Sequence, residues 1–180
     1  MNTAYIALGS NVAGAAGTPD ATLAAAVHRL EKLGKVSRRS SLYSTRPVGY
    51  EAQPRFLNAV VALETSLSPH QLLDHLLVIE KEFGRNRSNS IPGGPRTLDL
   101  DILLMDNLEI SDSQLELPHP RLDQRAFVLV PLHEIAPQVS VTGLGKSVEQ
   151  LLEELHQIEA DDLDAVLRVE SDAWQPAAQP

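Results

Sequence analysis

The stretch Thr3-Ala4-Tyr5-Ile6-Ala7-Leu8 begins the pattern that decides the fold. It predicts a short strand, and Gly9-Ser10-Asn11 directly after it is a turn signal. Thr18-Pro19 has the form of a helix N-cap followed by proline, and Gly34 stands where that helix would end. A second strand is predicted over residues 36–43. The first part of the chain is therefore a strand–helix–strand unit.

A second unit repeats this order further along the chain. Residues 56–65 predict a strand, Ser68-Pro69 repeats the cap-and-proline signature, and Gly84 ends the second helix. Residues 98–105 predict the closing strand. Residues 127–135 are compatible with a helix or a strand, and of the two we predict a helix. Two such units in succession are typical of an antiparallel sheet covered by two helices. We therefore predict an α+β fold of the ferredoxin-like type.

Length and composition limit the class of protein. A chain of 180 residues with 43% hydrophobic and 22% charged residues favours one soluble globular domain, which we place at residues 1–160 with an acidic C-terminal tail at 161–180. The absence of cysteine excludes disulfides, thiolate metal sites and thiol catalysis. No apolar run approaches the roughly 20 residues of a membrane span, and the N-terminus has no secretory pattern. We expect a cytoplasmic protein without a membrane partner.

The net charge of −9 is unevenly distributed. Residues 149–172 hold nine acidic residues and one basic residue, whereas residues 81–98 hold four basic residues and one acidic residue. A local basic loop suits a small polyanion such as a nucleotide, and a solvated surface loop is the alternative. Nucleic-acid modules usually carry a broad basic face, so we expect no nucleic-acid partner. The acidic helix predicted over residues 147–158 either covers a sheet edge or joins two copies, which predicts a monomer or a weak dimer.

The most informative string is Gly94-Pro95-Arg96-Thr97-Leu98-Asp99-Leu100-Asp101-Ile102. Alternate residues of a strand project to the same side, so Asp99 and Asp101 share one face, with Cα atoms about 6.6 Å apart. Such a pair can chelate one metal ion or hold two Mg²⁺ ions between them. On its own, an Asp-x-Asp sequence is more often the polar face of a half-exposed strand than a metal site.

Three nearby arginines favour the metal site over the polar strand face: Arg85, Arg87 and Arg96. Carboxylates that bind a metal, beside guanidinium groups that bind phosphate, are what a metal–polyphosphate site requires. His119 lies between two prolines and is either a turn-forming residue or a side chain presented to a ligand.

An irregular stretch from Thr45 to Tyr50 leads towards a strand that begins with Phe56-Leu57-Asn58. The aromatic ring could stack on a flat heterocycle, and the Asn58 amide offers both a donor and an acceptor. The alternative is that Phe56 is a core residue and that Asn58 caps a strand end.

These strings together resemble the 6-hydroxymethyl-7,8-dihydropterin pyrophosphokinase family of folate biosynthesis. The likeness extends over about residues 3–138 and includes Tyr5-Ile6-Ala7-Leu8-Gly9-Ser10-Asn11, the string at 94–101, Pro118-His119-Pro120-Arg121 and residues 125–132. It implies the ferredoxin-like fold and the transfer of the terminal pyrophosphate of ATP to the pterin hydroxymethyl group, with release of AMP and two Mg²⁺ ions as cofactors.

The resemblance also implies roles for single residues. The implied ligands of both Mg²⁺ ions are Asp99 and Asp101, which with Arg85 and Arg96 form the catalytic set. The implied pterin contacts are Thr45, Pro47, Val48, Phe56, Asn58 and Phe127. The implied ATP contacts are Glu80, Arg87, Ile102, His119 and Arg125.

One segment departs from the family. Many relatives carry an Arg-Trp pair in their active-site lid, just before the Gly-Pro-Arg-Thr string, and residues 88–94 lack it. Two alternatives follow from this change: a paralogue that acts on another pterin, and a protein that binds a pterin without catalysis. A single-stranded RNA binder is a third alternative, but the chain lacks the closely spaced aromatic residues on which such proteins stack bases. No side chain is a compelling general base.

Overall fold

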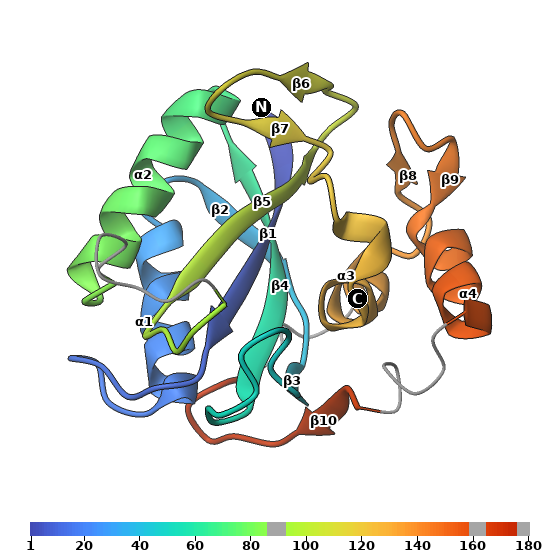
Figure 1. The fold of residues 1–180 in the computed structure, drawn as a ribbon. Coiled ribbons are helices and arrows are strands. Elements are labelled where there is room, and N and C mark those ends of the chain that lie inside the picture. The colour runs from blue at the N-terminus through green and yellow to red at the C-terminus, as the bar shows by residue number, and fades with distance from the viewer. Residues whose placement is uncertain (86–92, 159–164, 176–180) are drawn as a thin grey trace.

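The computed structural model describes residues 1–85, 93–158 and 165–175, and its centre is one antiparallel sheet. The six strands of this sheet are β1 (Asn2–Ser10), β2 (Lys35–Arg39), β3 (Leu42–Thr45), β4 (Phe56–Thr65), β5 (Asp99–Met105) and β10 (Leu167–Val169). Their order is β10-β3-β4-β1-β5, and β2 pairs with the other half of β4 (Figure 1). With β2 and β3 counted as one bent strand, this is the ferredoxin-like order.

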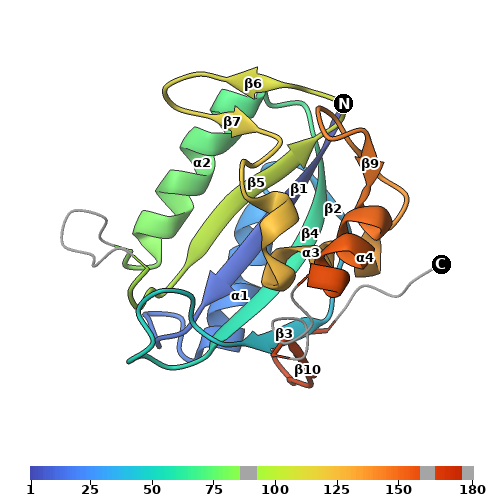
Figure 2. The same ribbon diagram turned by 45° about the vertical axis from the view of Figure 1, so that its right-hand side comes forward.

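Helices cover both faces of the sheet. Helices α1 (Pro19–Leu30) and α2 (Pro69–Glu82) lie on one face, and α3 (Ala126–Ile135) lies on the other, with α4 (Val148–Ile158) packed outside it (Figures 1 and 2). The α+β prediction and the helix predicted over 127–135 are confirmed. The smaller elements are β6 (Ile110–Ser111), β7 (Glu116–Leu117), the 3-10 turn η2 (Leu122–Gln124), β8 (Ser140–Val141) and β9 (Lys146–Ser147). None of the helices in the described ranges is long and apolar enough to cross a membrane.

Side chains along the central strands point alternately to the two faces of the sheet, and this separates core residues from site residues. In β5, Leu100 and Ile102 are buried in the core shared with α1 and α2. Asp99 and Asp101 are therefore directed to the α3 face, opposite Gly9 and Ala7 of β1. The predicted common face of the two carboxylates is confirmed.

The helix ends follow their capping residues to different degrees. Ser68 forms a complete capping box with Gln71, and Gly84 ends α2 with a φ of +87°. Thr18 makes no side-chain cap bond, and α1 ends at Leu30, before Gly34. Gly34 has a different role from the predicted one, because a Cβ there would overlap the carbonyl oxygen of Glu64. This glycine lets the chain pass close to β4.

The strand predicted over 36–43 is two strands, broken at Ser40-Ser41. Glu134 of α3 accepts hydrogen bonds from the Ser41 backbone N–H (2.8 Å), the Ser41 hydroxyl (2.8 Å) and the Tyr43 hydroxyl (2.9 Å). Burial, followed by the bond to Glu134, raises the pKa of Tyr43 to about 12. The break therefore supplies donors to a partly buried carboxylate of the covering helix.

The C-terminal segment 165–175 packs on the domain. Its strand β10 pairs with β3, and the buried Trp174 donates from Nε1 to the Ser40 carbonyl oxygen at 2.9 Å. The Ser171 hydroxyl donates to Asp20 of α1 at 2.6 Å. The division into a domain at 1–160 and a tail at 161–180 stays a prediction, but the described part of that tail belongs to the sheet and the core.

Candidate active site

A cavity of about 720 Å³ lies beside the first turn of α3, over the neighbouring ends of the central strands. Its volume is in the range of small-molecule sites. Its floor includes Gly9 of β1, Asn58 of β4, and Asp99 and Asp101 of β5. Gly9 matters here, because a Cβ at this position would lie 3.1 Å from Asn58 Oδ1. The absence of a side chain at Gly9 keeps the floor open between the Asn58 amide and the carboxylates of Asp99 and Asp101.

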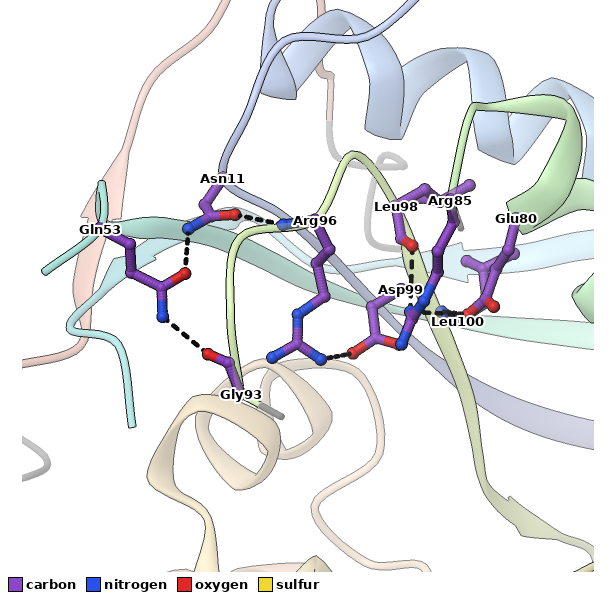
Figure 3. A network of polar contacts seen from close by, with 9 residues as sticks. All are labelled: Asn11, Gln53, Glu80, Arg85, Gly93, Arg96, Leu98, Asp99 and Leu100. Carbon is purple, nitrogen blue, oxygen red and sulfur yellow. Dashed lines mark hydrogen bonds and ion pairs between the residues drawn. The ribbon is translucent and has the colours of Figure 1, made fainter. Parts of the chain in front are cut away.

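One end of the cavity carries a chain of alternating charges (Figure 3). Asp99 forms an ion pair with Arg85 through one oxygen and with Arg96 Nη1, at 2.7 Å, through the other. Arg85 Nη1 also donates to Glu80 Oε1 and to the Leu98 carbonyl oxygen, each at 3.0 Å. Glu80 is 2% exposed, and the same oxygen accepts from the Leu100 N–H at 2.8 Å. The arrangement fixes Asp99 from two sides.

Of the two arginines that bind Asp99, Arg96 is the one that lines the cavity. Its guanidinium also lies over the Phe56 ring, 5.1 Å from the centroid. The Arg96 Nε atom is buried and makes no hydrogen bond within the described residues. The planar guanidinium of a cavity-lining arginine suits a phosphate oxygen.

A second group of cations lies on the η2–α3 side. Arg121 and Arg125 both line the cavity. The pKa of Arg125 is lowered chiefly by burial and then by repulsion from Arg121, while Asp101 and Asp99 favour its charged form. Burial, followed by repulsion from Arg125 and Arg121, lowers the pKa of His119 to about 4. The His119 imidazole is therefore neutral at pH 7.

The loops around the cavity are joined by Asn11 and Gln53 (Figure 3). Asn11 is 3% exposed, accepts from the Arg96 N–H at 2.8 Å, and donates to Gln53 Oε1 at 2.9 Å and to the Pro54 carbonyl at 3.0 Å. Gln53 Nε2 donates in turn to the Gly93 carbonyl at 2.7 Å. The loop before β4 and the loop before β5 are thus held together through one buried amide.

The other end of the cavity suits a flat heterocycle. The Asn58 amide donates to Thr45 Oγ1 at 2.6 Å, which leaves its carbonyl oxygen and a second N–H for a ligand. Phe56 and Phe127 both line the cavity, from β4 and from α3. The guanidinium of Arg125 lies 5.5 Å from the centroid of Phe127.

Most of the predicted site residues meet at this cavity. Its lining includes Thr45, Pro47, Val48, Phe56, Asn58, Arg96, Asp99, Asp101, Arg125 and Phe127. It does not include Glu80, Arg85, Ile102 or His119. Ile102 is 4% exposed and is packed in the core towards α1 and α2. Arg87, with residues 88–92 of the altered lid, lies outside the described residues. The ligand roles of all these residues stay predictions.

Sequence reasoning did not identify several residues of the site. Asn11 belonged only to a turn signal, although its place in Gly9-Ser10-Asn11 after a strand marked the right loop. Gln53 and the two cavity-lining residues Ala165 and Val166 had no local signal. Their contacts join segments far apart in the chain.

Known proteins are similar in sequence to this chain over most of its length. The model of the family described as 7,8-dihydro-6-hydroxymethylpterin-pyrophosphokinase (HPPK) matches residues 5–137. The chain is 46% identical over 151 residues to the 2-amino-4-hydroxy-6-hydroxymethyldihydropteridine pyrophosphokinase of Bacillus subtilis, over 83% of this chain and 87% of the relative. It is 47% identical over 138 residues to the Haemophilus influenzae protein of the same name, over 76% and 82% of the two chains.

Solved structures share the fold. A triple mutant of Plasmodium falciparum HPPK-DHPS matches with a TM-score of 0.75 and 16% identity, over 94% of this chain and 47% of that chain. The wild-type protein with SDX-DHP matches with a TM-score of 0.73 and 16% identity, over 94% and 48%. This chain therefore spans about half the length of those two solved chains. At this identity the likeness shows the fold alone.

Proposed function

This chain belongs to the 7,8-dihydro-6-hydroxymethylpterin-pyrophosphokinase family, and we propose that it transfers the terminal pyrophosphate of ATP to the hydroxymethyl group of 6-hydroxymethyl-7,8-dihydropterin, with release of AMP. One observation carries the proposal: a single cavity has carboxylates and arginines at its β5 end and two phenylalanines with an amide at its β3–β4 end. These are the groups that a polyphosphate and a flat heterocycle require, side by side.

The reaction is an in-line displacement at phosphorus. The pterin hydroxymethyl oxygen forms a bond to the β-phosphorus of ATP, and the bond from that phosphorus to the oxygen bridging the α- and β-phosphates breaks. The hydroxyl proton leaves to solvent, and AMP departs with the bridging oxygen. Binding both substrates in one cavity makes this step effectively unimolecular, which is the main contribution that positioning gives to phosphoryl transfer.

The arginines supply charge where it develops. We assign Arg96 to the phosphates, because it lines the cavity beside Asp99 and its backbone is held by Asn11. Arg125 lies on the opposite side of the cavity and neutralises the leaving group. Arg85 acts through Asp99, which it holds together with Glu80.

The donor set at β5 fits magnesium. Asp99 and Asp101 face the cavity from one side of a strand, and Mg²⁺ is usually held by one or two carboxylates together with phosphate oxygens and water. Within the described ranges no group of three or more histidine, aspartate or glutamate side chains could form an all-protein cage. We propose that these two residues would hold the two ions with the nucleotide. The ions would neutralise phosphate charge and orient the reacting groups.

The ring end sets the position of the pterin. The faces of Phe56 and Phe127 would enclose the heterocycle, and the free polar atoms of Asn58 would bind its edge. The neighbouring Thr45 keeps the Asn58 amide in one orientation, because its hydroxyl accepts from the amide nitrogen. Pro47 and Val48 would complete the wall.

We further propose a cytoplasmic monomer or weak dimer that binds no nucleic acid. The overall charge of −9 supports the last point, because it opposes a polyanion much larger than a nucleotide. Gel filtration with and without ATP tests the oligomeric state.

The experiment measures AMP formed from ATP and Mg²⁺ with and without 6-hydroxymethyl-7,8-dihydropterin. The native chain should form AMP only with the pterin, and Asp101→Asn should lose at least a hundredfold in kcat. The exposed Glu109→Gln variant is the matched control and should keep full activity. AMP formation with a different pterin alone would identify a paralogue. Pterin binding without AMP would identify a binding protein.

A further inference from the structure

We propose that Val166, just before β10, is a specificity-determining residue that forms the outer wall of the pterin end of the cavity. The inference rests on the proposed function. Val166 and Ala165 line the cavity, and both lie beyond residues 5–137, the part that the family model matches. The C-terminal segment would thus provide part of the substrate site.

The register of the sheet places Val166 beside the predicted pterin contacts. In the β10–β3 pair, Leu167 lies opposite Ser44, Arg168 opposite Tyr43 and Val169 opposite Leu42. One step back along this antiparallel register brings Val166 opposite Thr45, which itself lies opposite Phe56 of β4. Residues that lie opposite one another point to the same face of a sheet. Val166, Thr45 and Phe56 therefore lie in one row on the cavity face of the sheet, and Val166 is the outermost of the three.

This wall is held in place from both sides. Arg55 Nη2 donates to the Ala165 carbonyl at 2.8 Å and to the Ser44 carbonyl at 2.9 Å, so one guanidinium ties the segment to β3. Beyond β10, Trp174 is 3% exposed and fixes the segment in the core. Val166 itself packs against the hydrophobic cluster of α3, as Phe127 does. A wall anchored in this way can exclude groups that do not fit.

The chemistry of the reaction fixes which edge of the ring meets the wall. The hydroxymethyl group must point to the phosphates, and therefore to Asp99 and Asp101 on β5. The opposite edge of the bicycle, which carries the amino and oxo groups of the pyrimidine ring, then points to β3 and β10. Asn58 and Thr45 can bind the polar atoms of that edge. Val166 would close the space beyond it and exclude substituents on the amino group.

Val166→Ala tests this placement. Titration calorimetry measures the Kd of 6-hydroxymethyl-7,8-dihydropterin in the presence of a non-hydrolysable ATP analogue. Loss of two methyl contacts should raise this Kd by about tenfold, with the KM for ATP unchanged. Leu167→Ala is the matched control, because Leu167 is adjacent, 53% exposed and on the other face of the strand. It should leave both constants unchanged.

A second arm uses an analogue with a methyl group on the pyrimidine amino nitrogen. The native chain should turn it over at least tenfold more slowly than the parent pterin, and Val166→Ala should recover most of that loss. Trp174, the single tryptophan of the chain, reports whether the segment stays docked, through its buried-type emission. A native chain that is active, with a docked Val166→Ala variant unchanged in pterin Kd and in analogue turnover, would overturn this inference alone. A native chain without pterin-dependent AMP would overturn the proposed function instead.

Discussion

Replacing Asn11 by aspartate changes one atom of the amide that joins the two loops of the site. The introduced carboxylate keeps an acceptor for the Arg96 N–H but loses both hydrogens of Nδ2. The oxygen that replaces this nitrogen then faces Gln53 Oε1 and the Pro54 carbonyl, which are both acceptors. The Gln53 amide cannot turn to present a donor instead, because its Nε2 already donates to the Tyr50 and Gly93 carbonyls.

The loss in free energy of unfolding caused by Asn11→Asp follows from these contacts. Two lost hydrogen bonds contribute about 1 kcal/mol each, and the acceptors left without donors add a further penalty of similar size in a site that is 3% exposed at Asn11. We expect the free energy of unfolding at pH 7 to fall by about 3 kcal/mol. The penalty should shrink at low pH, because a protonated carboxyl group can donate to Gln53 or to Pro54. The folded state raises the pKa of the introduced group, so stability is lost as pH rises.

Urea unfolding at pH 7 and pH 4.5 measures both effects. Asn107→Asp is the matched control, because the same change is made at an exposed turn residue. The reasoning fails if Asn11→Asp unfolds at the wild-type urea concentration, or if its deficit is the same at both pH values. A double-mutant cycle of Asn11→Ala with Gln53→Ala should give a coupling energy of about 1 kcal/mol.

Three further changes test other parts of the structure. Asn58→Leu should raise the pterin Kd by about a hundredfold in calorimetry, because it removes the amide from the ring end, and an unchanged Kd would place the pterin elsewhere. For His119, burial and then Arg125 lower the folded-state pKa to about 4, so wild-type stability should fall as pH drops from about 6.5 to about 4. The loss should be about 2 kcal/mol once solvent screening is allowed for, and urea titrations of His119→Gln should lack this slope. Gly34→Ala should lower the free energy of unfolding by about 2 kcal/mol, because its Cβ would overlap the Glu64 carbonyl, and a wild-type melting temperature would contradict this.

The local sequence pattern was sufficient to predict those features whose contact partners lie on the same strand or helix. The common face of Asp99 and Asp101 follows from the two-residue period of a strand, whatever lies beside it. The capping box at Ser68 is equally local, since its partner Gln71 lies three residues away. The order of these elements also predicted the sheet.

The features that the sequence pattern did not predict depend on contacts between residues far apart in the chain. The donors at the break between β2 and β3 bind Glu134, which lies 93 residues away from Ser41. Arg85 forms ion pairs with both Glu80 and Asp99, and the pattern of the sequence did not indicate these partners. The buried Trp174 binds the carbonyl of Ser40, which lies 134 residues away in the chain. No period or cap in the sequence reports such pairings.

The late addition of β10 has a consequence during synthesis of the chain. Strand β3 lies next to β4 on one side only until residues 167–169 pair with its other side. A nascent or truncated chain therefore has an unpaired strand edge, which can pair with a second chain. The same chain also lacks Trp174, so part of the core near Ser40 is open. Once residues 167–169 pair with β3, the edge of the sheet on this side is the three-residue strand β10, and a short edge strand offers little template to a second chain.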